Sequence, residues 1–165
     1  MEEFTRMNRL SYITLLLAGI LLACLSGCSE RDTVVSVEPD DPEMNAAIAK
    51  ARETLPQFWE TFEKREHGES DFSLKVRITD KRGTEHFWAI DIERRDGKIM
   101  GTINNDPDTV RSVKLGDRIE IPEADISDWL YMRDGKMVGN YTLKPLFKGM
   151  PAAEVERYKT IMADP

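Results

Sequence analysis

Two stretches of the sequence alternate apolar and polar residues, and this period of two constrains the fold more than any other feature. Successive side chains of a β-strand point to opposite faces, so the alternation predicts strands with one buried face. A short DKRGT turn separates the two stretches, which predicts a hairpin. The positions expected to face inward are Phe72, Leu74, Val76 and Ile78 in the first strand and His86, Trp88, Ile90 and Ile92 in the second.

Asp-Gly pairs at 96–97 and 134–135 indicate two further hairpins. A two-residue type I′ turn needs positive φ at both central residues, and Asp-Gly is a favoured pair for it. The segments RDGKIMGTI (95–103) and RDGKMVGNY (133–141) share five of nine residues. Duplication could explain the match, but a shared turn chemistry explains it more simply. The strands expected around these turns, together with 118–121 and 128–131, give a sheet of about six.

An amphipathic helix is predicted to begin after Asp41. The Asp41 carboxylate can cap it, and Pro42 suits the first helical position because its missing N–H would be unpaired there. Pro56 interrupts the apolar stripe, and Thr54 with Gln57 fits a capping box, so we expect a kink or a restart near Pro56. The stripe consists of Met44, Ile48, Ala51, Leu55, Phe58 and Phe62.

A short closing helix is predicted after Pro151, with Val155, Tyr158 and Ile161 or Met162 on one side. The predicted fold class is therefore α+β, a single domain over residues 42–165. In it the N-terminal helix packs on an antiparallel meander of about six strands. A strongly bent sheet that approaches a small barrel is the alternative.

The N-terminus has the pattern of an export signal. Arg6 and Arg9 precede an apolar run of 16 residues, Leu10–Leu25, which is short for a membrane span. The following residues, Leu25-Ser26-Gly27-Cys28, resemble the bacterial lipobox, which implies removal of residues 1–27 and acylation of Cys28. A signal peptide with an incidental cysteine, or an uncleaved anchor, are the alternatives. Residues 28–41 are expected to form the acylated N-terminus and a polar tether.

The lipobox resemblance also predicts where the protein resides. Acyl chains on Cys28 would hold the protein at a membrane without spanning it. Serine at position 29, where aspartate would favour the inner membrane, favours the outer membrane, with the domain in the periplasm. The two cysteines, Cys24 and Cys28, would then leave no free thiol. We expect no metal and no cofactor, and the net charge of −7 argues against nucleic acid as a partner.

Several motifs together carry a resemblance to a known family. They are ARETLPQFWE, Glu85-His86-x-Trp88, Gly101 with Asn104 and Pro107, Gly116-Asp117, Ile126-Ser127-Asp128-Trp129-x-Tyr131, and Gly139-Asn140-Tyr141-Thr142-Leu143. Over residues 43–147 the chain resembles the YegJ-like family of bacterial domains, domain of unknown function 2314. The resemblance implies a domain boundary and transfers no activity.

Aromatic residues near the last hairpin are the candidate binding surface. Trp129, Tyr131 and Tyr141 could stack on a glycan or anchor a protein partner, with Asp128 and His86 beside them. Each ring could instead complete the core, and Asp128 could hold the adjoining loop by accepting backbone N–H bonds. His86 could likewise be a hydrogen-bonded core residue.

Three functional hypotheses follow from the sequence. The first is a noncatalytic envelope lipoprotein that binds an envelope protein or a cell-wall glycan and meets the membrane through the lipid on Cys28. The second is an acidic immunity-type protein that neutralises a basic toxin. The third is a hydrolase acting on cell-wall material, although the sequence identifies no catalytic residue. Its candidate groups would be His86 or the carboxylates Asp91, Glu93, Asp125 and Asp128.

Overall fold

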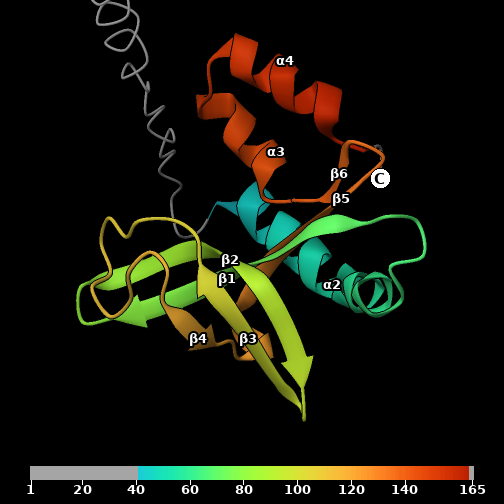
Figure 1. Cartoon of the computed structure of the whole chain (residues 1–165). Helices are drawn as coiled ribbons and strands as arrows, with labels where there is room; N and C mark the ends of the chain where they lie inside the picture. The colour runs from blue at the N-terminus through green and yellow to red at the C-terminus, as the bar shows by residue number, and fades with distance from the viewer. Residues whose placement is uncertain (1–40, 164–165) are drawn as a thin grey trace, which may run out of the picture. The chain divides into compact units, whose positions relative to one another are not determined.

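The structure of the chain is a computed structural model that describes residues 41–163. The predicted signal peptide, the acylation site Cys28 and the tether lie outside the described residues. The described part begins with helix α2 (Pro42–Lys64) and continues through six strands to the short helices α3 (Leu143–Leu146) and α4 (Ala152–Ile161) (Figure 1). This arrangement confirms the predicted α+β class.

Helix α2 begins where its cap was predicted. The Asp41 carboxylate accepts hydrogen bonds from the backbone N–H groups of Glu43 at 2.8 Å and Met44 at 2.9 Å. The predicted restart at Pro56 is wrong, because the helix continues without a break through this proline. The Thr54 hydroxyl does not cap a new helix but donates to the Lys50 carbonyl at 2.8 Å, one turn back.

The six strands form one antiparallel sheet in the order β4-β3-β2-β1-β5-β6. Both Asp-Gly turns have positive φ at their two central residues, 51° and 77° at 96–97 and 51° and 71° at 134–135, as predicted. Strands β4 and β6 lie at opposite edges, so the sheet is open and does not close into a barrel. The strands are β1 (Ser70–Asp80), β2 (Gly83–Arg95), β3 (Lys98–Ile103), β4 (Arg118–Glu120), β5 (Ile126–Arg133) and β6 (Lys136–Gly139).

The alternation predicted for β2 is wrong over its first half. Phe87 and Ala89 are fully buried, whereas His86, Trp88 and Ile90 lie partly exposed on the opposite face. The pairing of β2 with β3 shifts register between Ile90 and Glu93, and Asp91 there has φ 49°. This β-bulge inserts one residue and returns Ile92 to the buried face.

The core lies on one face of the sheet, between the sheet and two covering segments. Helix α2 contributes Ala51, Leu55, Phe58 and Trp59 to it, and β1 contributes Phe72, Leu74 and Val76. A smaller cluster of Phe87, Ile103 and Val110 forms where the loop after β3 folds back over the same face. The sheet therefore has a second face that α2 does not cover.

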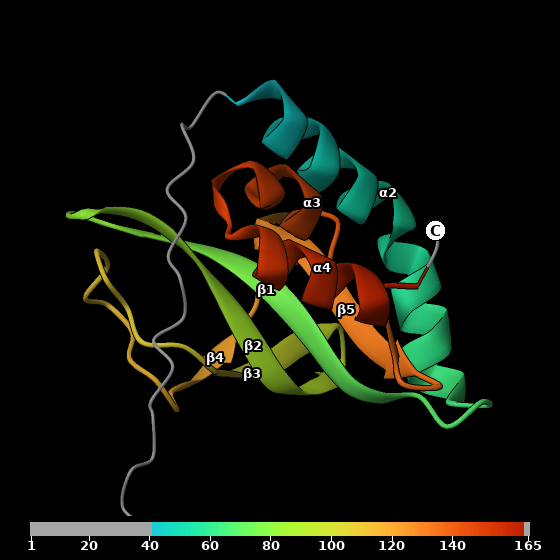
Figure 2. The same cartoon turned by 90° about the horizontal axis from the view of Figure 1, so that it is seen from above.

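The C-terminal segment packs back on the rest of the domain. The predicted closing helix is α4, and the structure adds the single-turn helix α3 and the 3-10 turn η2 (Phe147–Gly149) before it. Lys148 of η2 forms an ion pair with Glu43 at the start of α2, at 2.6 Å. After α4, the Ala163 N–H donates to the Met137 carbonyl of β6 at 2.8 Å. In Figure 2, α3 and α4 lie over β1 and β5, with α3 next to α2.

Candidate functional site

Two of the predicted binding aromatics are core residues. Trp129 is only 2% exposed and Tyr131 only 5%, so neither can stack on a ligand without unfolding. Their rings stack on each other with centroids 5.9 Å apart, and the Trp129 indole N–H donates to the Ala51 carbonyl of α2 at 2.9 Å. Tyr141 is partly buried and packs edge-on against Trp129. Trp129 and Tyr131 therefore complete the core, and of the three predicted aromatic residues only Tyr141 keeps part of its surface exposed.

Asp128 is fully buried and organises the chain after β6. Its carboxylate accepts hydrogen bonds from the backbone N–H groups of Trp129 at 2.8 Å, Tyr141 at 3.2 Å and Thr142 at 2.8 Å, and from the Thr142 hydroxyl at 2.7 Å. The loop-holding role considered for Asp128 is confirmed. Burial raises the pKa of this carboxyl, while the hydrogen bonds from Thr142 and Trp129 and the nearby Lys75 act to lower it.

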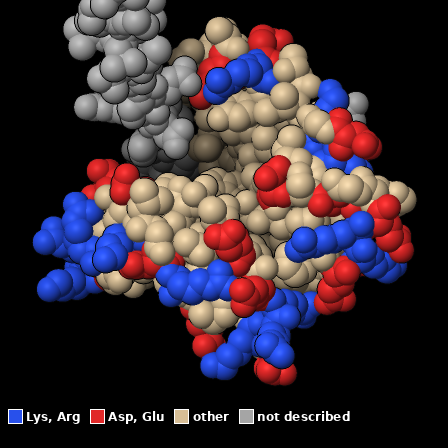
Figure 3. Space-filling model, viewed as in Figure 1, with Lys and Arg blue, Asp and Glu red and all other residues tan. Residues whose placement is uncertain are grey.

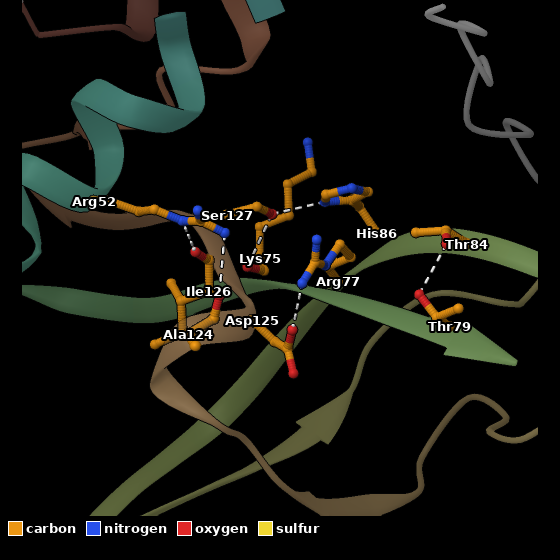
Figure 4. A network of polar contacts seen from close by, with 10 residues as sticks. All are labelled: Arg52, Lys75, Arg77, Thr79, Thr84, His86, Ala124, Asp125, Ile126 and Ser127. Atoms are coloured by element: carbon orange, nitrogen blue, oxygen red, sulfur yellow. Dashed lines mark hydrogen bonds and ion pairs between the residues drawn. The ribbon is translucent and has the colours of Figure 1, made fainter. Parts of the chain in front are cut away.

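Strand register brings polar side chains together on the face that α2 leaves uncovered. Lys75 of β1 lies opposite both Trp88 of β2 and Asp128 of β5, and Arg77 lies opposite His86. A register shift in the pairing of β1 with β5 places Ser127 beside this row. Arg52 reaches the same place from α2 (Figure 4). We call Arg52, Lys75, Arg77 and His86 the basic cluster.

Hydrogen bonds fix the members of the basic cluster around the start of β5. The Arg52 guanidinium donates from Nε to the Ile126 carbonyl at 2.9 Å and from Nη2 to the Ala124 carbonyl at 3.1 Å. Arg77 forms an ion pair with Asp125 at 2.9 Å. Because Arg52 donates to one carbonyl at the start of β5 and to another just before it, this side chain also fastens α2 to the sheet.

Lys75 is partly buried at the centre of the cluster. Its ammonium donates to the Thr142 hydroxyl at 2.9 Å and lies 5.2 Å from the ring centroid of Trp88, within the range of a cation–π contact. Burial lowers the pKa of Lys75, and the negative charge of Asp128 acts in the opposite direction. The charged form of Lys75 is thus stabilised by the Thr142 hydroxyl, the face of the Trp88 ring and the buried Asp128 carboxylate.

His86 and Ser127 form a close pair, with 2.7 Å between His86 Nδ1 and Ser127 Oγ. Ser127 Oγ also lies 3.2 Å from the Lys75 carbonyl, which can accept its proton. Burial is the largest cause that lowers the pKa of His86 to about 4, followed by the charges of Lys75, Arg77 and Arg52. The imidazole is therefore neutral at pH 7.

A serine and a histidine in contact suggest nucleophilic catalysis, but the geometry here does not support it. Ser127 is 1% exposed, so a substrate carbonyl cannot reach its hydroxyl. A histidine with a pKa of about 4 is also a weak base at neutral pH. Three of the four predicted carboxylate candidates are engaged separately, since Asp125 pairs with Arg77, Asp128 binds Thr142 and Glu93 pairs with Arg118 at 2.8 Å. The fourth, Asp91, lies at the bulge of β2. Within residues 41–163, no three histidine, cysteine or acidic side chains gather as metal ligands.

Comparison with known proteins gives the chain its family. The family described as "Uncharacterized protein conserved in bacteria" (DUF2314) matches residues 41–163. The chain belongs to the DUF2314 family. The match covers all the residues whose structure is described above, so the basic cluster lies within the DUF2314 region of this chain.

Two curated relatives of this DUF2314 protein were found. The chain is 37% identical over 146 residues to the "Uncharacterized protein YegJ" of Escherichia coli strain K12, covering 88% of this chain and 94% of the relative. It is 33% identical over 119 residues to a "Putative ankyrin repeat protein" of Neisseria meningitidis serogroup B, covering 67% of this chain but 47% of that relative. No solved structure matches. Among the described residues of the DUF2314 domain, no helix combines the length and the hydrophobicity that crossing a membrane requires.

Sequence reasoning missed three residues of this DUF2314 site, Arg52, Lys75 and Ser127. Lys75 could have been noticed, because a lysine in the middle of a strand of apolar residues needs a polar partner for its ammonium group. Arg52 carried none, since a helical arginine outside the apolar stripe is indistinguishable from a solvated one. Ser127 reaches His86 because of the register shift in β5, which the alternation pattern does not encode.

Proposed function

We propose that the chain is a bacterial envelope lipoprotein whose DUF2314 domain binds another envelope component and catalyses no reaction. Cys28 would carry the lipid, the outer membrane would be its location, and the domain would face the periplasm. The partner would be an envelope protein or a cell-wall glycan. The observation that carries the binding part is the basic cluster, in which ordered polar side chains surround a serine that no substrate can reach.

The fixed geometry of the cluster favours binding over chemistry. Arg52 and Arg77 are each held by acceptors from the segment 124–126, and His86 is held by Ser127. Side chains held in this way lose little further rotamer entropy when they engage a ligand, which raises affinity. Catalysis would need in addition an exposed nucleophile or a base with a pKa near 7, and the cluster offers neither.

The lipid anchor is supported by the sequence that precedes the domain. A basic flank, a short apolar run and Leu25-Ser26-Gly27-Cys28 together make up the pattern of a lipoprotein signal. The tether from Ser29 to Asp41 could span roughly 40 Å at about 3.3 Å per extended residue. Such a length would leave the domain free to meet a partner some distance from the bilayer.

Mass spectrometry of the protein extracted from its own membranes tests the anchor. We expect a mature chain that begins at Cys28 and carries acyl mass, and a Cys28→Ser variant that stays unprocessed and unacylated. An unmodified wild-type chain, or a mature N-terminus at another residue, would overturn the lipoprotein proposal. Native spectra of the same extract would report any reproducible additional mass that marks a bound component.

The absence of catalysis has a separate test. Purified wild-type protein and the His86→Gln and Ser127→Ala variants are each incubated with cell-wall material, and soluble fragments are quantified. We expect all three samples to match the buffer control. Release of fragments by the wild type that either variant abolishes would instead support the hydrolase hypothesis.

A further inference from the structure

The basic cluster concentrates positive charge in a protein whose formal net charge is −7. On the face seen in Figure 3, lysine, arginine and acidic side chains are interspersed, so that many can neutralise one another. In the cluster, Arg77 has an ion-pair partner in Asp125. Within residues 41–163, neither Arg52 nor Lys75 forms an ion pair with any carboxylate. Both cations therefore donate only to neutral acceptors, and the carboxylate nearest to Lys75 is that of Asp128 across the strand pair.

The same side chains retain unused hydrogen-bond donors. A guanidinium has five N–H bonds, and Arg52 uses one from Nε and one from Nη2 on backbone carbonyls. An ammonium has three, and Lys75 uses one on Thr142. The Ser127 hydroxyl donates its one proton to the Lys75 carbonyl, so His86 Nδ1 donates to Ser127 Oγ and the neutral ring has no proton on Nε2.

These side chains lie around one place. Figure 4 shows Arg52 and His86 on either side of Ser127, with Lys75 extending between them. Arg77 lies directly opposite His86 across the two strands, and Ser127 bridges the His86 ring and the Lys75 carbonyl, so these groups are neighbours. Because Lys75 and His86 are partly buried, a charge brought to this place would interact more strongly than it would in bulk water.

We propose that the basic cluster is an oxyanion-binding site, in which Arg52 and Lys75 together bind a carboxylate or phosphate group of the ligand beside the His86 ring. The proposal rests on the function proposed above and gives the ligand a chemical class. Arg52 supplies a planar fork suited to two oxygens, and Lys75 supplies a point charge. Arg77, already paired with Asp125, adds to the positive potential.

The competing explanation is that these cations are structural. Arg52 would then only fasten α2 to the edge of β5, and Lys75 would only balance the charge of Asp128. The charged groups that act on His86 are Lys75 and Arg77 on β1 and Arg52 on α2. Two carboxylates contact these cations, Asp125 of the 3-10 turn η1 (Glu123–Asp125) at Arg77 and Asp128 of β5 opposite Lys75. If these cations are only structural, an added anion should not bind to them and should not change the signals of the His86 ring.

The test uses the two histidines of the full-length protein, solubilised in detergent and labelled with ¹⁵N in the imidazole rings. Acetate and inorganic phosphate are titrated separately at pH 7 and constant ionic strength, against sodium chloride as the reference salt. We expect the His86 ring signals to shift and saturate, with a Kd on the order of 1 mM for so small an anion. The exposed His67 ring is the internal control and should not move.

A bound anion should also raise the pKa of His86, because a nearby negative charge favours the imidazolium. A saturable response to acetate identifies a carboxylate ligand, and a stronger response to phosphate identifies a phosphate ligand. Identical shifts in sodium chloride, equal shifts of His67, or no shift of His86 would each overturn the proposal.

Two glutamine variants on the same helix sharpen the test. Arg52→Gln removes a cluster cation and should weaken anion binding about tenfold, the loss expected for one charge-assisted contact. Lys50→Gln removes one positive charge two residues away, where the side chain pairs with Glu53 in solvent, and should leave Kd within about twofold. Equal affinity in both variants would contradict the site.

Failure of this inference is distinguishable from failure of the proposed function. If Arg52→Gln does not fold, the wild-type titration against sodium chloride decides by itself. An unacylated Cys28 would remove the proposed location and leave the anion titration unchanged. Conversely, a silent His86 in an acylated chain would overturn the oxyanion site and leave the envelope proposal standing.

Discussion

The Asp128 carboxylate and Thr142 are joined by two hydrogen bonds, one from the Thr142 backbone N–H at 2.8 Å and one from its hydroxyl at 2.7 Å. The pair connects β5 to the start of the C-terminal segment, and the Thr142 hydroxyl in turn accepts from Lys75. One buried carboxylate therefore links the last hairpin, the C-terminal segment and the basic cluster.

Asp128→Asn should destabilise the domain by about 2–4 kcal/mol. The amide would turn an NH₂ group toward backbone N–H donors, and several charge-assisted hydrogen bonds would be lost in a buried place. Urea unfolding followed by tryptophan fluorescence measures the change. Asp125→Asn is the control, because this less buried ion pair should contribute at most about 1 kcal/mol. Equal effects of the two substitutions would contradict the role given to Asp128.

Gly139→Ala should destabilise the domain by about 3 kcal/mol or more. Gly139 has φ 87°, and a Cβ there would meet the backbone of Trp129 and lie 2.6 Å from the indole carbon Cε3. Gly135→Ala is the matched control in the same hairpin. Its φ of 71° carries a similar strain, but a Cβ would meet nothing within 4 Å, so about 1 kcal/mol is expected. The difference in unfolding free energy isolates the collision with Trp129.

Trp129→Phe should cost about 1–2 kcal/mol more than Trp59→Phe. Both side chains are buried, but the Trp129 N–H is bonded to the Ala51 carbonyl, whereas Trp59 Nε1 finds no acceptor among the described residues. Replacing Trp59 removes a buried donor without a partner, and replacing Trp129 removes a formed bond. Thermal and urea unfolding of both variants measure the difference, and a larger loss in Trp59→Phe would contradict it.

Stability should fall as the pH drops from about 6.5 to about 4 because of His86. Its pKa is lowered from 6.5 to about 4 on folding, so in this window the unfolded chain binds the proton more readily. Above pH 6.5 both states are neutral and the effect disappears. The shift sets an upper bound of about 3 kcal/mol, which solvent screening of a partly exposed ring reduces to about 1–2 kcal/mol.

Urea unfolding at pH 7 and pH 5 of the wild type, His86→Gln and His67→Gln tests this assignment. Substitution of His86 should reduce the pH dependence between the two conditions, and substitution of the exposed His67 should not. An unchanged dependence in His86→Gln would assign the effect to other groups.

Much of the fold could be predicted because it rests on local chemistry. The Asp41 cap and the two Asp-Gly turns depend on residues within a few positions of each other, and all three formed as predicted. Pro56 did not break α2, because the buried stripe on both sides of it packs into one core. Tertiary packing there outweighs a local preference.

The site was harder to predict because it depends on register. The bulge at Asp91 moves one residue out of the alternation, so a pattern read from Ile92 places His86 and Trp88 on the wrong face. Two of the three aromatic residues chosen from the sequence are core residues, and the basic cluster joins side chains from positions 52 to 86. Nothing in a linear pattern brings Arg52 to Ile126; only the packing of α2 beside β5 does so.

The hydrogen bond from the Ala163 N–H to the Met137 carbonyl affects how readily the sheet could pair with a second molecule. A strand at the border of a sheet exposes backbone groups that a second molecule could pair with, which is a common route to aggregation. Strand β6 has this border position, and the chain after α4 satisfies one of its carbonyls. At the other border, β4 is only three residues long. Both borders therefore offer a second copy of the domain few backbone groups with which to extend the sheet.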